Sequence, residues 1–124
     1  EQEAIQLSLE IEDFPMDFLS DMDTTTIFSN LLDNAIDACM ELDRSVKRIE
    51  VVLCQKMGLL ALRMTNTCQA AADLSPRQWH STKKDHMGIG LSNVRKTVEK
   101  YHGVVSVRTK EELFQVSVTI PIKS

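Results

Sequence analysis

Long apolar runs and early basic residues are absent from this sequence. No apolar run in its 124 residues approaches the roughly 20 that a membrane-spanning helix needs, so we expect no membrane contact by this domain. Twelve acidic side chains and no basic one precede Arg44, and nothing there resembles a secretory signal peptide. The formal net charge of -4 also argues against a general nucleic-acid-binding protein.

Cysteine and aromatic residues are few. Cys39, Cys54 and Cys68 are odd in number and follow no metal-ligand spacing, so we expect three reduced cysteines in a cytoplasmic domain. Aromatic side chains make up 5% of the chain, which predicts an aliphatic core. The length fits one domain over residues 1–124, and because the sequence lacks an initiator methionine we expect it to be a piece of a longer chain.

The two ends of the chain differ in charge. Residues 77–124 contain nine Lys or Arg side chains against four acidic ones, the reverse of the first 43 residues. A small anion is therefore expected to approach the second half of the chain, and a cation the first half.

The stretch from Ile27 to Cys39 has the periodicity of a two-faced helix. At about 100° per residue its apolar side chains fill one half, while Asn30, Asn34, Asp37 and Glu41 fall within an arc of about 60° on the other. Asparagine is a poor helix former because its amide competes for backbone hydrogen bonds. Two asparagines one turn apart therefore indicate a role other than helix formation. The oxygen-rich arc predicts a site for a hard cation such as Mg²⁺ beside a phosphate; the alternative is an ordinary solvated face.

The remaining pattern predicts strands around this helix. Strict alternation of polar and apolar residues indicates a half-buried strand over residues 3–11, and the helix should then run from about residue 24 to residue 42, capped by Asp21 or Asp23. Two hairpins are expected, from residues 48–55 with 59–67 and from residues 104–109 with 113–120. Helices segregated from mostly antiparallel strands define an α+β domain, a sheet covered on one face by helices.

The segment between the hairpins holds the least regular part of the chain and a glycine pair. Residues 69–87 have no clear periodicity, apart from a possible short helix within residues 70–79, and are basic near their end. Gly88 and Gly90 then open an amphipathic helix that Gly103 should end at the C′ position. Glycine before a helix lets backbone amides approach an anion, but Gly-x-Gly alone is weak evidence.

Two motifs in this order resemble those of a known family. Residues 30–38 (NLLDNAIDA) are similar to the N box of the GHKL ATP-binding fold, shared by histidine kinases, gyrase-type topoisomerases, Hsp90 and MutL. Residues 88–91 (GIGL) are similar to its G2 box, and residues 114–121 to its closing strand. The run from Ser81 to Lys83, shortly before that G2 box, resembles the histidine kinases of Gram-positive bacteria that sense peptide pheromones.

The resemblance implies a fold and a function. The fold would be the Bergerat type, a two-layer sandwich with a mixed, mostly antiparallel sheet. The function would be that of the ATP-binding catalytic domain of a two-component sensor histidine kinase. Such a domain donates the ATP γ-phosphoryl group to a histidine on a separate dimerisation domain, and acts indirectly on a response regulator. The chain would then be a cytoplasmic part of a membrane-anchored bacterial sensor, with ATP and Mg²⁺ as its cofactors.

The resemblance also implies a set of site residues and no catalytic nucleophile in this chain. Asn34 would coordinate Mg²⁺, Asn30 would hold phosphate or a metal-bound water, and Asn66 would anchor adenine. Phosphate contacts would come from Ser81, Thr82 and Lys83, with Lys84 as a second candidate beside Lys83, and from the backbone at Gly88, Gly90 and Leu91. Residues from about 72 to 87 would form a lid that orders on nucleotide. The three histidines, His80, His86 and His102, do not lie on a long helix of the phosphoacceptor kind.

Departures from the family pattern leave rival functions open. The usual Asp-x-Gly-x-Gly box after the third strand is absent, and Thr65, Asn66 and Thr67 stand in its place. Gyrase-type and Hsp90-type hydrolases carry a glutamate where this chain has Asn30, and an amide cannot accept a proton from water at neutral pH, so phosphoryl transfer is favoured over hydrolysis. The alternatives are an anti-sigma-factor-type serine kinase and a degenerate nucleotide-free interaction module of the same fold.

Overall fold

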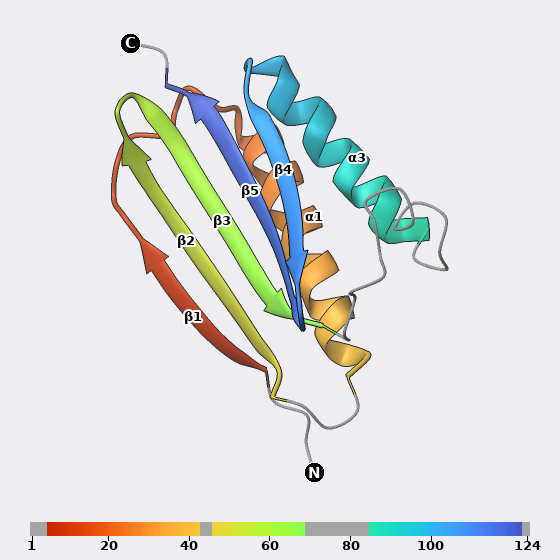
Figure 1. Ribbon diagram of the computed structural model, residues 1–124. Coiled ribbons are helices and arrows are strands. Elements are labelled where there is room, and N and C mark those ends of the chain that lie inside the picture. The colour runs from red at the N-terminus through yellow and green to blue at the C-terminus, as the bar shows by residue number, and fades with distance from the viewer. Residues whose placement is uncertain (1–4, 43–45, 69–84, 123–124) are drawn as a thin grey trace.

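The computed structural model describes residues 5–42, 46–68 and 85–122. In these ranges two helices lie on one face of a five-stranded sheet whose strand order is β1-β2-β3-β5-β4 (Figure 1). The elements are β1 (Gln6–Ile11), α1 (Asp21–Met40), β2 (Arg48–Lys56), β3 (Leu59–Thr67), α3 (Asp85–Lys100), β4 (Val104–Lys110) and β5 (Leu113–Pro121). Neither described helix is both long and apolar enough to cross a membrane.

The sheet is mixed, with one parallel pair. β1 runs parallel to β2, and α1 makes the crossover between them, while the β2–β3, β3–β5 and β4–β5 pairs are antiparallel. The two predicted hairpins are therefore confirmed, within one residue at each end. The α+β prediction, a mixed and mostly antiparallel sheet with helices on one face, is confirmed as well.

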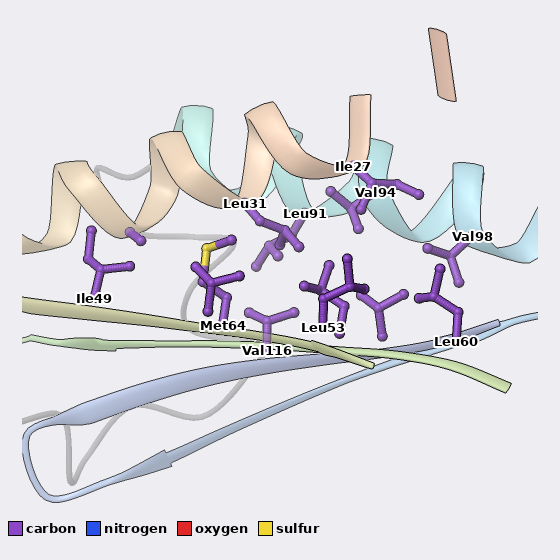
Figure 2. Packing of buried hydrophobic residues seen from close by; sticks show 14 of the residues in the cluster. Ile27, Leu31, Ile49, Leu53, Leu60, Met64, Leu91, Val94, Val98 and Val116 are labelled. Carbon is purple, nitrogen blue, oxygen red and sulfur yellow. The ribbon is translucent and has the colours of Figure 1, made fainter. Parts of the chain in front are cut away.

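The core is an aliphatic layer between the helices and the sheet (Figure 2). Alternate residues of β2, β3 and β5 point toward the helices because side chains of a strand alternate between its two faces. Ile27 and Leu31 of α1 meet them from the helix side, as do Val94 and Val98 of α3. Phe114 is the aromatic side chain in the buried cluster of the described residues, as the low aromatic content predicts.

Helix α1 begins earlier than the sequence pattern predicts. Its N-cap is Ser20, whose hydroxyl accepts a hydrogen bond of 3.1 Å from the backbone N–H of Asp23. The prediction of Asp21 or Asp23 as the cap is therefore wrong, because serine one residue upstream satisfies the free amide instead. Asp21 and Asp23 lie in the first turn, where their charges favour the helix dipole.

Strand β1 differs most from its predicted environment. Its register places Leu7 beside Ile49, Leu9 beside Val51 and Ile11 beside Leu53, so its apolar side chains share the face that the helices cover. They are nonetheless 56%, 59% and 56% exposed. The prediction of a half-buried strand is wrong because α1 packs mainly against β3, and the layer of described helices ends before it reaches β1.

The end of α3 also differs from the prediction. His102 takes the left-handed conformation, with φ of 65°, and the N–H of Gly103 bonds the carbonyl of Val98 at 3.0 Å. His102 is therefore the C′ residue of this Schellman-type ending, and Gly103 follows it. Gly103 is needed for a different reason: a Cβ atom there would lie 2.5 Å from the carbonyl oxygen of Thr119 in β5.

A cluster of polar side chains ties the start of α1 to the end of α3. The carboxylate of Asp23 is buried, accepts a hydrogen bond from the Tyr101 hydroxyl and pairs with the Lys100 ammonium at 2.9 Å. These contacts, that of Tyr101 first, hold the pKa of Asp23 below its usual value, and Asp23 in turn raises the pKa of Lys100. The cluster therefore joins the two helices at the end away from the glycines of α3.

The first prediction concerns acid stability. Because the pKa of Asp23 is lowered on folding, its contribution is complete above the ordinary value of 3.8 and is lost as pH falls through the lower folded value. Replacing Tyr101 by phenylalanine removes the largest cause of that pKa shift. Above pH 4 the variant should therefore have a lower melting temperature than the parent protein, and below pH 4 its melting temperature should depend less on pH. Thermal melts of both proteins across about pH 2 to 6 measure this, with Lys96→Gln on the exposed side of α3 as control. Parallel pH curves for Tyr101→Phe and the parent would contradict it.

Candidate functional site

Two asparagines of α1 and one glycine of α3 come together between the helices. A Cβ atom built on Gly90 would lie 3.4 Å from Oδ1 of Asn30, 3.4 Å from Oδ1 of Asn34 and 3.5 Å from Nδ2 of Asn34. Both side-chain amides therefore face the backbone of α3 at Gly90. The structure thus brings together three residues that the sequence motifs singled out, from segments about 60 residues apart.

The orientation of Asn30 is set by its own helix. Its Nδ2 donates a hydrogen bond of 2.8 Å to the carbonyl oxygen of Thr26, one turn earlier. With the amide nitrogen engaged, Oδ1 is directed to Gly90 as a hydrogen-bond acceptor. An acceptor suits a metal-bound water, which donates, better than a phosphate oxygen, which also accepts. The role of Thr26 was not predicted, although the four-residue spacing could have suggested it.

Asn34 is buried, so the alternative interpretation of its arc as an ordinary solvated face does not hold for this residue. Its side chain is 4% exposed, and its Nδ2 is the one buried side-chain nitrogen or oxygen atom of the described residues with no hydrogen-bond partner. Asn34 is buried because α3 packs against the polar flank of α1 and covers this residue. Burying an amide without a partner costs free energy, on the order of 1–3 kcal/mol, so the residue is not explained by stability.

The donor set at this place fits Mg²⁺ bound together with a phosphate group. Amide oxygens are hard ligands of the kind that Mg²⁺ prefers, and the ion usually takes one or two groups from the protein. Asp37 follows Asn34 by three residues and so lies next to it on the helix. Among the described residues no group of three or more His, Cys, Asp or Glu side chains could hold a metal, so a cation here would depend on oxygens from its ligand.

Asn66 occupies a buried position at the end of β3. Its neighbours across the sheet are Ile49 and Phe114, so it points toward the helices. It is 3% exposed, and its Nδ2 donates a hydrogen bond of 2.9 Å to the carbonyl oxygen of Thr67. With the nitrogen engaged, Oδ1 is the atom of this side chain that could accept a hydrogen bond from an amino group.

The other predicted site residues lie at the start of α3 or outside the described residues. Helix α3 begins at Asp85, so Gly88 and Gly90 lie inside it and not before it, contrary to the prediction. Gly88 is among the first four residues, whose N–H groups have no partner within a helix, whereas Gly90 is beyond them. Leu91 is in the hydrophobic core. Ser81, Thr82, Lys83 and Lys84 lie outside the described residues, as does most of the predicted lid, whose last three residues, 85–87, are helical.

Comparison with known proteins supplies a family and a fold. A family model described as a GHKL domain matches residues 19–121. No curated protein matches the sequence. The fold matches a histidine kinase domain from the Erythrobacter litoralis EL346 blue-light activated histidine kinase, with a TM-score of 0.76 and 15% sequence identity over 98% of this chain.

Two further solved structures have the same fold. The nucleotide-free catalytic domain of the histidine kinase ThkA has a TM-score of 0.71 and 16% identity, covering 94% of this chain and 78% of that one. The Acinetobacter baumannii histidine kinase AdeS has a TM-score of 0.73 and 11% identity, covering 97% of this chain and 55% of that one. The present chain spans about half of the Erythrobacter structure, 53% of its length.

Proposed function

The chain belongs to the GHKL domain family, and we propose that it is the ATP-binding catalytic domain of a two-component sensor histidine kinase. One observation carries the proposal: the oxygens of Asn30 and Asn34 converge at Gly90, and Nδ2 of Asn34 is buried without a partner. A fold kept only as a scaffold would have no use for that arrangement, because an apolar residue at position 34 would be more stable. The arrangement is therefore best explained by a bound ligand.

In this proposal each residue has a distinct role. Oδ1 of Asn34 would hold Mg²⁺, and Oδ1 of Asn30 would accept a hydrogen bond from a metal-bound water. Mg²⁺, when bound, neutralises charge on the phosphates, which is most of what phosphoryl transfer requires from a protein. Oδ1 of Asn66 accepts a hydrogen bond from the adenine amino group, and the amide of Gly88 faces a phosphate. Ser81, Thr82 and Lys83 would supply further phosphate contacts.

The chemistry proposed is transfer to a protein side chain. Asn30 cannot take a proton from water, and its nitrogen is engaged with Thr26, so it supplies no general base for hydrolysis. The γ-phosphoryl group would pass to a histidine on a separate dimerisation domain and then to a response regulator. We further propose that the parent protein is a membrane-anchored bacterial sensor of the peptide-pheromone branch, with this domain in the cytoplasm.

The test is ATP binding with little turnover. The 124-residue chain should bind ATP in the presence of Mg²⁺, as calorimetry can measure, and release phosphate far more slowly than about one per second. Adding a dimerisation-domain fragment that carries a histidine should then yield phosphohistidine, with a His→Ala fragment as control. Absence of ATP binding would favour the nucleotide-free module, and fast phosphate release would favour a hydrolase.

A second prediction separates binding from stability at Gly90. An alanine Cβ would stand in ordinary van der Waals contact with the amides of Asn30 and Asn34, at 3.4 Å, without forcing them to move. Alanine is the better helix former by about 1 kcal/mol, so Gly90→Ala should raise the melting temperature. The same methyl group covers the amide oxygens, so ATP affinity with Mg²⁺ should fall about tenfold or more.

Two measurements on one variant check the Gly90 prediction. Thermal melting reports the helix effect, and ATP titration reports the site. Ser92→Ala, on the exposed side of α3, is the matched control and should leave ATP affinity unchanged. Unchanged ATP affinity in a stabilised Gly90→Ala protein would show that the nucleotide does not approach this pair of amides.

A further inference from the structure

An apolar surface is left open beside α1, away from the asparagines. It consists of Leu7, Leu9 and Ile11 of β1 with Leu32 and Ile36 of α1, and we call it the β1 strip. Leu32 and Ile36 are 37% and 36% exposed, and Leu32 is two residues, about 200° around the helix, from both Asn30 and Asn34. Because α3 packs on the asparagine flank of α1, the opposite flank faces β2 and β1.

The β1 strip is a consequence of the widths of helices and strands. Helices pack about 10 Å apart and strands lie about 4.8 Å apart, so two helices cover about four strands. Here α1 and α3 lie over the part of the sheet formed by β3, β5 and β4, and neither lies behind β1 (Figure 1). The uncovered side chains continue the same face as the core residues Ile49, Val51 and Leu53. The strand left uncovered is therefore β1, at the edge of the sheet beside α1, where a third helix could lie only partly over the sheet.

The charge around the β1 strip restricts what can lie there. Residues 5–42, which form β1, α1 and the segment joining them, contain nine acidic side chains and no Lys or Arg. Asp33 is exposed and directly follows Leu32, and it is three residues from Ile36, so it borders the strip on the helix surface. Asp13, Asp17 and Asp21, in and after the joining segment, are exposed as well. An apolar strip beside the exposed carboxylate of Asp33, in a stretch of chain without basic side chains, complements a helix that has apolar residues on one side and Lys or Arg beside them.

We propose that the β1 strip is a docking site for a basic amphipathic helix of another protein. The helix lies on the face of β1 beside α1, with its apolar side chains on Leu7, Leu9 and Ile11 and its basic side chains near Asp33. This interaction is separate from nucleotide binding, because the strip and the asparagine pair lie on opposite flanks of α1.

The other possible occupants fit less well. A second copy could pair with the outer edge of β1, which is the last strand of the sheet, but strand pairing uses the edge and would leave the faces of Leu7, Leu9 and Ile11 open. An anionic lipid surface is disfavoured because the carboxylates of this region would be repelled by it. An acidic helix is disfavoured for the same reason.

Two model peptides test the proposal on the 124-residue chain. One is a fluorescent Leu/Lys amphipathic helix of about 15 residues, or ~22 Å, and the other has Glu at every Lys position. Fluorescence anisotropy should show binding of the Lys peptide at least about tenfold tighter than that of the Glu peptide. Leu9→Ser and Asp33→Lys should each weaken it about tenfold or more, while Val104→Ser, an equally exposed apolar position on β4, should not. ATP affinity should be the same in Leu9→Ser and Val104→Ser as in the parent protein.

Each contrary result overturns the proposal in a distinct way. Equal binding of both peptides would remove the role of charge, and full binding to Leu9→Ser would place the peptide elsewhere. No binding of the Lys peptide would show that the strip is not a helix site. A dimer, seen by sedimentation, that Leu9→Ser dissociates would make a second copy the occupant. Binding of the free chain to phosphatidylglycerol vesicles through Leu9 would make it a lipid site.

Discussion

Replacing Asn34 by alanine should abolish the Mg²⁺ enhancement of ATP binding and leave the protein folded. The side-chain oxygen of Asn34 is the proposed metal ligand, and alanine has none. ATP affinity with Mg²⁺ should therefore fall to its value without Mg²⁺, a loss of about tenfold or more, equivalent to about 1.4 kcal/mol. The measurement is calorimetric titration of ATP with and without Mg²⁺.

The same Asn34→Ala variant should not lose stability, although it loses ATP affinity. Nδ2 of Asn34 is buried with no partner, so its removal relieves a desolvation cost, and alanine is the better helix former. The melting temperature should therefore stay the same or rise. This combination separates a ligand-binding role from a structural one, because removal of a structural asparagine would lower the melting temperature.

Two further variants control this experiment. Asn93→Ala removes an exposed asparagine from α3 and should change neither property. Asn34→Asp keeps an oxygen ligand in the same place and should retain the Mg²⁺ enhancement, although the buried charge will lower stability. A folded Asn34→Ala protein with the full enhancement would show that Asn34 is not the metal ligand.

The second large effect is expected at Gly103, where alanine should destabilise the whole domain. Its Cβ would lie 2.5 Å from the carbonyl oxygen of Thr119, 2.7 Å from Val98 and 2.9 Å from Ile120. The carbonyl cannot retreat easily because Thr119 is paired with Ala61 on one side and Val104 on the other. Overpacking of this kind costs about 3 kcal/mol, a large part of the stability of a small domain.

Urea denaturation of Gly103→Ala and of Gly58→Ala measures the effect against a matched glycine. Gly58 has φ of 77° but nothing within 4 Å of its Cβ position, so alanine there should cost only about 1 kcal/mol of backbone strain. Equal losses in the two variants would mean that the close approach of β5 to Gly103 is relieved by a small shift of the backbone.

The sequence predicts the bounds of the helices and strands better than the burial of their side chains. Hairpin ends follow from alternation and turn residues, so the bounds of β2 to β5 are nearly those observed. The burial of Asn34 depends on where α3 packs, and the exposure of Leu9 depends on how far the helix layer extends. Neither is a local property, so periodicity alone could not give the exposure of either residue.

The candidate site also combines features that the local sequence predicts with features that depend on tertiary packing. The residue types of Asn30 and Asn34 and the spacing of Gly88 and Gly90 suggested a metal and phosphate site, and the family resemblance joined them into one. The contact of both amides with Gly90 is a result of tertiary packing. The residues that end the helices were predicted less well from local sequence. The N-cap of α1 is Ser20, where an aspartate was expected, and His102 takes the left-handed position that Gly103 was expected to occupy.

The parallel pairing of β1 has a consequence for the order of folding. The β2–β3 and β4–β5 hairpins close over tight turns, at little cost in chain entropy, whereas β1 can pair with β2 only after the long crossover through α1 is in place. With one neighbouring strand and no helix above it among the described elements, β1 gains little from joining. It should therefore be the last strand to form and the first to open, so a helix that docks on it would fix in place the least protected part of the native state.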